Sequence, residues 1–95
     1  MGNQTTDGVE TGRALEIPKP NYPAIAVAAH ASGEVQVQVL IDTDGTVIAA
    51  NAVAGHPLLR AASVTAAKGA RFSPTKRNGK PVKVTGIIVY NFLAR

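Results

Sequence analysis

Few residues of this 95-residue chain could carry out acid–base or nucleophilic chemistry. The chain has no cysteine and two histidines, His30 and His56. Each histidine lies beside a predicted helix end, where a ring more commonly caps a helix or stabilises a turn than acts as a catalytic base. Glu34 begins a predicted strand, and no pair of carboxylates falls in an evident pocket. The sequence therefore predicts a protein that is not an enzyme and that needs no cofactor.

Two further acids lie in the segment Asp42-Thr43-Asp44-Gly45, which is similar to the opening of a calcium-binding loop. The remaining ligands of such a loop are missing, including the glutamate expected about six residues after the glycine. The pair Asp44-Gly45 is also typical of a tight turn between two strands. We therefore expect a turn here and no metal site.

The charged residues are unevenly distributed along the chain. The net charge is +4, yet residues 1–34 hold more acids than bases. Residues 60–83 contain no acid and seven cations, namely Arg60, Lys68, Arg71, Lys76, Arg77, Lys80 and Lys83. Such a run usually consists of solvated side chains, but it also suits an anionic partner, for which the candidate contacts are Arg71, Lys76, Arg77, Lys80 and Lys83. A nucleic acid is not expected, because Phe72 is the only aromatic residue of this region that could stack on a base.

The elements that must position these residues begin after a polar N-terminus. Residues 1–16 contain three glycines and show no apolar period, which indicates a disordered leader or a remnant of cloning and leaves 17–95 as the domain. Residues 17–23 contain three prolines and predict an extended arm. An alanine-rich helix is expected from about Pro23, and Gly33 is its expected end.

A strand, a hairpin and a second helix are expected next. Val35, Val37, Val39 and Ile41 recur at every second position, which predicts a strand with one apolar face. The turn at 42–45 returns the chain into a second, antiparallel strand over 46–54. A helix then opens at Pro57 and ends at Lys68-Gly69, with small residues on its buried face; it runs through Leu58, Ala61, Ala62, Thr65 and Ala66.

The last part of the chain predicts one long strand. Residues 71–74 form a short extended piece, and Asn78-Gly79 lies at a turn. Residues 81–93 form the final strand, and one of its faces consists of Val82, Val84, Ile88, Tyr90 and Phe92. The element order predicts an α+β fold, with a three-stranded antiparallel-type sheet in the order 2-1-3 and two helices packed on one face.

The final strand would lie at an edge of this sheet. Residues 84–91 contain no charge and no proline, and Gly86 is the one residue there that could interrupt pairing. Such an edge aggregates, is covered by the leader, a dimer mate or residues 71–74, or accepts a peptide as an added strand. We expect the last of these, with a peptide-binding edge formed by Val84, Thr85, Gly86, Ile87, Ile88, Val89, Tyr90 and Asn91.

A series of short motifs follows a specific order along the chain. They are Tyr22-Pro23, Gly33-Glu34-Val35-Gln36-Val37, Asp42-Thr43-Asp44-Gly45, Gly55-His56-Pro57-Leu58-Leu59, Phe72-Ser73-Pro74, Asn78-Gly79-Lys80-Pro81-Val82 and Asn91-Phe92. In this order and spacing the chain resembles the C-terminal domain of the TonB energy-transducer family over about residues 18–93. It departs from that pattern at Gly69-Ala70-Arg71-Phe72, where many relatives place Trp-Arg or Trp-Lys before an aromatic residue.

The resemblance implies a periplasmic domain of a longer protein, held to the inner membrane by an N-terminal anchor and a Pro-rich spacer. Family members are coupled to an ExbB–ExbD motor. They bind the TonB box, a short peptide of outer-membrane transporters, beside the last strand and transmit proton-motive-force-derived work for the uptake of iron siderophores or other nutrients. Carried over, the docking strand is 84–91, with Asn21, Tyr22 and Pro23 close by. Membrane contact is then expected only through the anchor.

Two alternatives to this interpretation remain open. One is a homodimer in which two copies exchange strands. The other is a TolA-like envelope scaffold or a cell-wall-binding module that uses the basic surface of residues 60–83.

Overall fold

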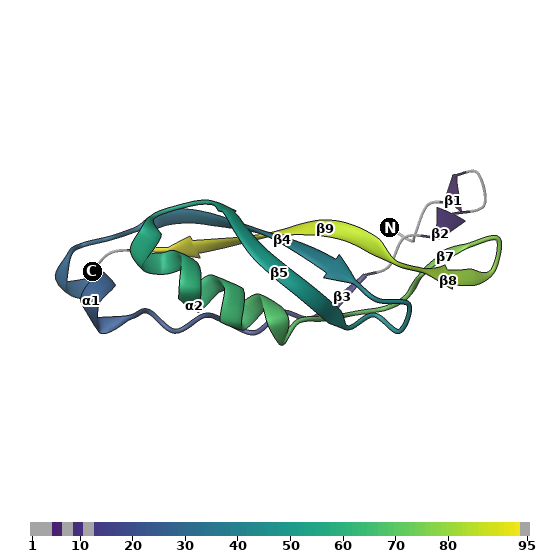
Figure 1. Ribbon diagram of the computed structural model, residues 1–95, viewed down its shortest axis with the longest axis horizontal. Helices are drawn as coiled ribbons and strands as arrows, with labels where there is room; N and C mark the ends of the chain where they lie inside the picture. Colours follow the sequence, from purple (N-terminus) through teal and green to yellow (C-terminus); the bar gives the residue numbers. More distant parts are fainter. Residues whose placement is uncertain (1–4, 7–8, 11–12, 94–95) are drawn as a thin grey trace.

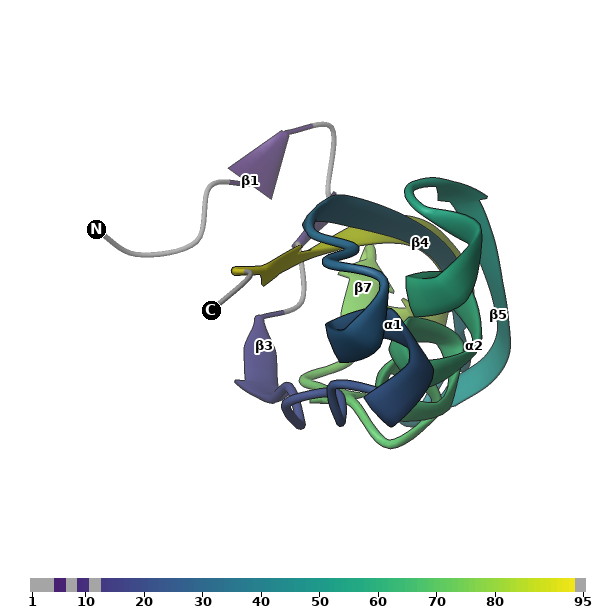
Figure 2. The same ribbon diagram turned by 90° about the vertical axis from the view of Figure 1, so that its left-hand side faces the viewer.

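The computed structural model describes residues 5–6, 9–10 and 13–93, and it describes side chains within 13–93. In this part of the chain it is an elongated α+β molecule with the helices α1 (Ala24–Ala28) and α2 (Pro57–Lys68). Its main sheet contains β4 (Gly33–Ile41), β5 (Val47–Ala54) and β9 (Val84–Phe92) in the order β5-β4-β9, with antiparallel neighbours. Both helices lie on the same face of this sheet (Figures 1 and 2). The predicted sheet order 2-1-3 is confirmed.

The core lies between α2 and the inner face of the sheet. Alternate residues of β4 are almost fully buried, as the sequence pattern predicts: Val35, Val37, Val39 and Ile41. The buried residues of α2 follow helical spacing and are Leu59, Ser63, Ala66 and Ala67. Most of these are small, so the helix lies close to the sheet, and the buried Ser63 hydroxyl donates to the Leu59 carbonyl at 2.8 Å. The expectation of small residues on this face is confirmed, although Ala61 and Thr65 are exposed.

The expected final strand is divided in two. β8 (Lys80–Val82) ends before Lys83, and β9 begins after it. β8 pairs with β7 (Thr75–Arg77) around the turn at Asn78 and Gly79, which have positive φ angles of 52° and 80°. The resulting β7–β8 hairpin extends away from the main sheet (Figure 1). The prediction of one strand over 81–93 is therefore wrong at Lys83, because Val82 pairs within this hairpin.

Short strands also occur before the arm. β1 (Thr5–Thr6) pairs with β2 (Val9–Glu10), and β2 pairs with β7. β3 (Ala14–Glu16) pairs with β6 (Arg71–Phe72), and its side chains are exposed. Part of the expected disordered leader is thus paired to the domain, but β3 adds nothing to the core. The division between residues 1–16 and 17–95 stays a prediction.

The arm of residues 17–23 contains neither helix nor strand and leads into α1. α1 ends earlier than the sequence predicts. His30 adopts a left-handed φ of 56°, and the Ala31 amide donates to the Ala26 carbonyl at 2.9 Å. Gly33 is instead the first residue of β4, so the expected helix end there is wrong. No helix in the described residues is long and apolar enough to cross a membrane.

The turn between β4 and β5 is linked through Phe72 and Ser73 to Arg13, which precedes β3 and the arm. Gly45 has a φ of +91°, and a Cβ atom there would lie 1.7 Å from the Phe72 carbonyl oxygen, so the position requires glycine. The Phe72 amide donates to the Gly45 carbonyl at 2.9 Å, and the Ser73 amide donates to the Arg13 carbonyl at 2.8 Å. These contacts fix one end of the N-terminal segment to the sheet.

Candidate functional site

The outer edge of β9 has no partner strand among the described residues. β9 pairs with β4 in an unbroken register from Phe92 opposite Gly33 to Val84 opposite Ile41. The leader and residues 71–74 were expected as alternative covers of this edge. β3 lies in the leader and β6 lies in 71–74, and the two strands pair with each other and not with β9. In an antiparallel ladder, alternate residues turn both N–H and C=O away from the neighbouring strand. Every second residue of β9 therefore presents both groups at an open edge.

The opposite edge of the sheet, formed by β5, is less regular. The register between β4 and β5 shifts between Gln36 and Val37 and again between Leu40 and Ile41. Such irregularities bend a strand and hinder the addition of another strand. The main sheet thus offers β9 as its better edge for a guest strand.

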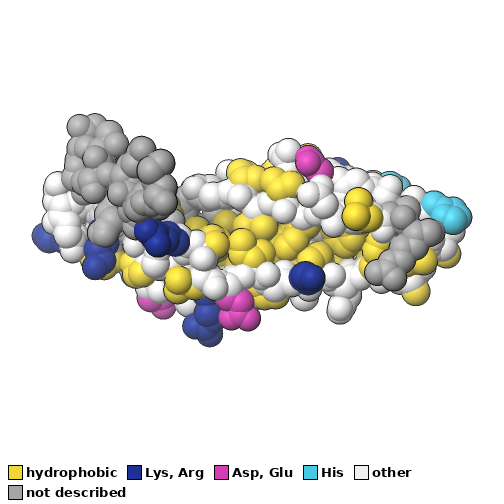
Figure 3. Space-filling model, turned by 180° about the vertical axis from the view of Figure 1, so that it is seen from behind, with side chains coloured by type: hydrophobic (Ala, Val, Ile, Leu, Met, Phe, Trp, Pro, Cys, Tyr) yellow, Lys and Arg dark blue, Asp and Glu magenta, His cyan; other side chains and the backbone are white. Residues whose placement is uncertain are grey.

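A groove of about 490 Å³ lies between the C-terminal half of β9 and the arm. It is lined by Lys19, Pro20, Tyr22, Val89, Tyr90, Asn91, Phe92 and Leu93. Figure 2 shows β3 and the end of β9 on the side of the molecule opposite α2 and β5, and Figure 3 shows a band of hydrophobic side chains along that side. The Tyr22 hydroxyl donates to the Ala31 carbonyl, and the Tyr22 ring contacts Phe92 edge to face. These contacts hold the arm as one wall of the groove.

The predicted peptide-binding residues are only partly brought together. Tyr22, Val89, Tyr90 and Asn91 line the groove, whereas the rest of the predicted set on β9, 84–88, lies along the same edge beyond it. Asn21 lies on the other side of the arm, in a groove of about 270 Å³ against α2. Pro23 is the N-terminal cap residue of α1 and does not line the groove.

Sequence reasoning missed four residues of the groove. They are Lys19, Pro20, Phe92 and Leu93. The predicted extended arm runs through Lys19 and Pro20, so the candidate set could have been extended along the arm to these two residues. The sequence placed Phe92 on one face of the final strand, and its place in the groove depends on the position of Tyr22.

Tyr90 has an unusual environment for a hydroxyl group. The residue is 7% exposed, and its hydroxyl oxygen is buried with no hydrogen-bond partner among the described residues. Burial raises the pKa of Tyr90 above its ordinary value of 10.0, because the ionised oxygen would lack water. Since Tyr90 also lines the groove, this unpaired polar group belongs to a residue of the candidate site.

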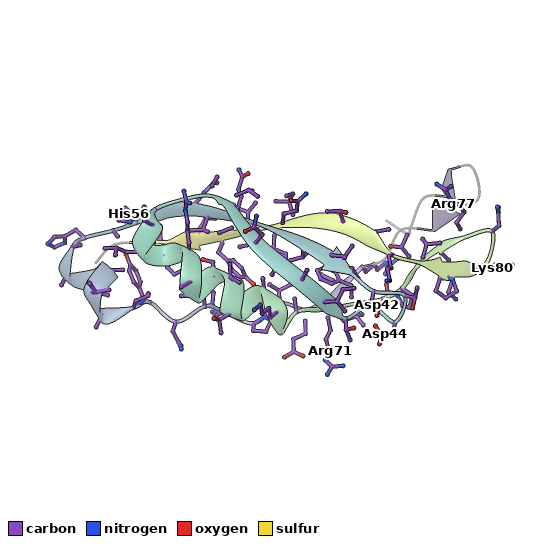
Figure 4. The ribbon with its side chains drawn as sticks, viewed as in Figure 1. Asp42, Asp44, His56, Arg71, Arg77 and Lys80 are labelled. Atoms are coloured by element: carbon purple, nitrogen blue, oxygen red, sulfur yellow. The ribbon has the colours of Figure 1, made fainter. Side chains whose placement is uncertain are left out.

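The basic residues do not form one continuous surface. Arg60 Nε donates to the Gly55 carbonyl at 2.9 Å near the start of α2. Hydrogen bonds from Thr46 lower the pKa of Asp44, and the charge of Arg71 adds to this effect. Figure 4 shows Arg71 near Asp44, whereas Arg77 and Lys80 lie farther out on the β7–β8 hairpin. Of the predicted anionic contacts, Lys76, Arg77, Lys80 and Lys83 lie on or beside this hairpin and are exposed, and Arg71 lies apart.

Three of the groups first considered for chemistry serve local structure, namely His56, Asp42 and Asp44. His56 caps α2, because its Nδ1 accepts the Leu58 amide at 3.1 Å. The Asp42 carboxylate accepts the Thr43 amide at 2.7 Å, and Asp44 accepts both the amide and the hydroxyl of Thr46, at 3.0 and 2.6 Å. The segment Asp42–Gly45 is therefore a turn, as predicted. Within the described residues, no three side chains of the kinds that bind metal ions are grouped together.

The part of the chain that is similar to known proteins includes both the edge of β9 and the groove. The family model of the Gram-negative bacterial TonB protein C-terminal region matches residues 18–93. The chain is also similar to the solution NMR structure of the Pseudomonas aeruginosa TonB C-terminal domain. That similarity has a TM-score of 0.63 and 26% sequence identity, and it covers 97% of this chain and 92% of the other. No curated protein matches the sequence.

Proposed function

The chain belongs to the family of Gram-negative bacterial TonB C-terminal domains, and on this premise we propose that it binds the TonB box of an outer-membrane transporter as a strand added to β9. The observation that carries the proposal is the regular, unpaired edge of β9 with a groove beside its C-terminal half. In strand addition, main-chain hydrogen bonds supply affinity, and pockets for alternate side chains supply specificity. We accordingly propose that the domain acts by binding and catalyses no reaction.

The surroundings of the edge suggest which guest side chains it favours. Successive side chains of an added strand point to opposite faces of the sheet. One set would lie over the groove, beside Pro20, Tyr22 and Phe92. The other set would lie beside Ile87 and Val89, which are 53% and 47% exposed on the outer face. Both surroundings are mainly apolar, so we expect a guest with apolar residues on both faces.

The wider role that we propose follows from the family. The domain works in the periplasm as part of an energy transducer that is anchored in the inner membrane and coupled to an ExbB–ExbD motor. It transmits proton-motive-force-derived work to a transporter for iron siderophores or another nutrient. A homodimer that paired β9 of two copies would use the same edge and would therefore compete with the peptide.

Amide hydrogen exchange followed by NMR tests the proposal directly. In the free protein, alternate amides of β9 are bonded to β4 and exchange slowly, while the intervening amides point outward and exchange fast. A TonB-box peptide is expected to protect the fast set in β9 and to leave β5 unchanged. Chemical-shift changes confined to the basic residues 60–80 would refute docking at β9.

A matched pair of variants separates the two edges. Val89 on β9 and Val53 on β5 are both 47% exposed. Val89→Lys should weaken peptide binding about two- to fivefold, because it removes a cross-strand apolar contact. Val53→Lys should leave the dissociation constant unchanged. Equal effects of the two substitutions would point to a general effect of charge.

A second test concerns the homodimer. Sedimentation of the free protein over a range of concentrations reports its oligomeric state. We expect that any dimer dissociates as the peptide is added, since both need the edge of β9. A dimer that persists at saturating peptide would place its interface elsewhere.

A further inference from the structure

The β7–β8 hairpin concentrates positive charge at one end of the proposed docking strand. Arg77, Lys80 and Lys83 are exposed there, and the sequence contains no Asp or Glu after Asp44. Lys76 is not counted with them, because it lies opposite Glu10 in the register of β2 and β7. Figure 4 shows Arg77 and Lys80 on the hairpin, away from the body of the molecule. The hairpin thus presents Arg77 and Lys80 as exposed cations, and Lys83 follows it as a third.

The hairpin adjoins the Val84 end of β9 along the chain. Lys83 alone separates β8 from β9, so a guest strand that reaches Val84 brings its flanking residues next to the hairpin. Each additional extended residue spans about 3.3 Å. A flank of about three residues therefore spans about 10 Å, which is comparable to the length of the three-residue strand β8.

We propose that the β7–β8 hairpin binds acidic residues that flank the docked peptide at its Val84 end. This inference rests on the proposed function and adds a second contact to it, with carboxylates as the recognised groups. Charge complementarity favours it, since Arg77 and Lys80 are exposed cations beyond the apolar part of the edge. Attraction between exposed charges is modest and is screened by salt, so the contact tunes affinity and partner choice.

The test compares three synthetic peptides that share one uncharged TonB-box core. One has neutral flanks, one carries aspartates before the core, and one carries aspartates after it. A guest strand parallel to β9 places its N-terminal flank at Val84, and an antiparallel guest places its C-terminal flank there, so one of the two acidic peptides should gain affinity. We expect a gain of about three- to tenfold at low ionic strength, which is lost at about 0.5 M salt.

Charge-matched variants assign the gain to the hairpin. The double variant Arg77→Gln/Lys80→Gln should abolish the preference for the acidic peptide while leaving affinity for the neutral peptide within about twofold. The control Arg60→Gln/Lys68→Gln removes the same charge from α2 and should preserve the preference. Thermal unfolding of both variants checks that each is folded.

The outcomes separate this inference from the proposed function. If the neutral peptide protects β9 amides but neither acidic flank improves binding, the hairpin contact is refuted and the docking edge stands. Equal loss of preference in both double variants also refutes the hairpin contact, since net charge alone would explain it. If the neutral peptide leaves β9 unchanged, the docking proposal fails, and the hairpin inference fails with it.

Discussion

The ring of Tyr22 meets the ring of Phe92 edge to face, with centroids 5.4 Å apart and an interplanar angle of 81°. The contact joins the proline-rich arm to the last residue of β9. Edge-to-face geometry is favourable because the positive edge of one ring approaches the negative face of the other. One wall of the groove therefore depends on a single side chain of the arm.

The substitution Tyr22→Ala should release that wall. It removes the ring contact and the hydrogen bond to the Ala31 carbonyl, so we expect the free energy of unfolding to fall by about 2 kcal/mol. Peptide affinity should fall as well, because the groove loses a side. Tyr22→Phe retains the ring and should cost only about 1 kcal/mol. Chemical denaturation and peptide titration measure both effects, and equal losses in the two variants would contradict the role of the ring.

Gly45 and Gly79 form a matched pair for testing the turn that anchors β6. Both have positive φ angles, of +91° and +80°. A Cβ atom on Gly45 would collide with the Phe72 carbonyl, whereas nothing lies within 4 Å of one on Gly79. Gly45→Ala should therefore destabilise the protein by about 3 kcal/mol or more, and Gly79→Ala by about 1 kcal/mol. Similar unfolding midpoints for the two variants would show that the close approach to Phe72 is not required.

Tyr90→Phe should leave stability unchanged or raise it by up to about 1 kcal/mol. The hydroxyl loses hydration on folding and gains no hydrogen bond within the described residues, so its removal leaves no partner unsatisfied. A loss of more than about 1 kcal/mol would instead reveal a hydrogen bond to the hydroxyl.

The same residue predicts a dependence of stability on alkaline pH. Burial raises the pKa of Tyr90 above 10.0 in the folded state, so the unfolded chain loses this proton first as the pH rises. The contribution of Tyr90 to the free energy of unfolding is fully present below pH 10.0 and decreases as the pH rises above this value. Denaturation of wild type and Tyr90→Phe between neutral pH and about pH 11 should show a steeper decline for wild type. Parallel curves would contradict the raised pKa.

Asp44 predicts a change in the β4–β5 turn at acid pH. Hydrogen bonds from Thr46 lower the pKa of Asp44 below its ordinary value of 3.8. Its contribution to the turn is therefore present above pH 3.8 and is lost as the pH falls through the lowered pKa. The Thr46 amide shift should follow this titration by NMR. Thr46→Val removes the hydroxyl donor and should move the midpoint up, towards 3.8; an unchanged midpoint would exclude the hydroxyl as the cause.

Local periodicity was enough to predict the sheet. The alternation of Val35, Val37, Val39 and Ile41 identified the buried face of β4, and the turn at 42–45 set the direction of β5. The element order then placed β9 beside β4, which the structure confirms. These features depend on neighbouring residues and on the general rules of strand pairing, so sequence alone carries them.

The candidate site could be predicted only in part. The uncharged run of residues 84–91 identified an edge strand, since charge and proline are properties of the sequence itself. The family resemblance placed Asn21 beside the docking strand with Tyr22, and in the structure Asn21 lines the groove against α2. Lys19 and Pro20 line both grooves, so alternation along the arm does not separate the two sides. Only the packing of Tyr22 on Phe92 decides which part of the arm faces β9.

By itself, the sequence determined the strands β4 and β5, the helix α2, the order of the main sheet and an edge free of charge, because each follows from side-chain type and short-range spacing. The structure decided three other features. The last strand divides at Lys83 because Val82 pairs with Thr75. The cations lie in three places, which are α2, the neighbourhood of Asp44 and the β7–β8 hairpin. The arm forms one wall of a groove beside β9. The division at Lys83 follows from local pairing across the turn at Asn78-Gly79, which the sequence placed there. The groove depends on contacts between residues far apart in the chain, such as Tyr22 and Phe92, and no local pattern encodes it.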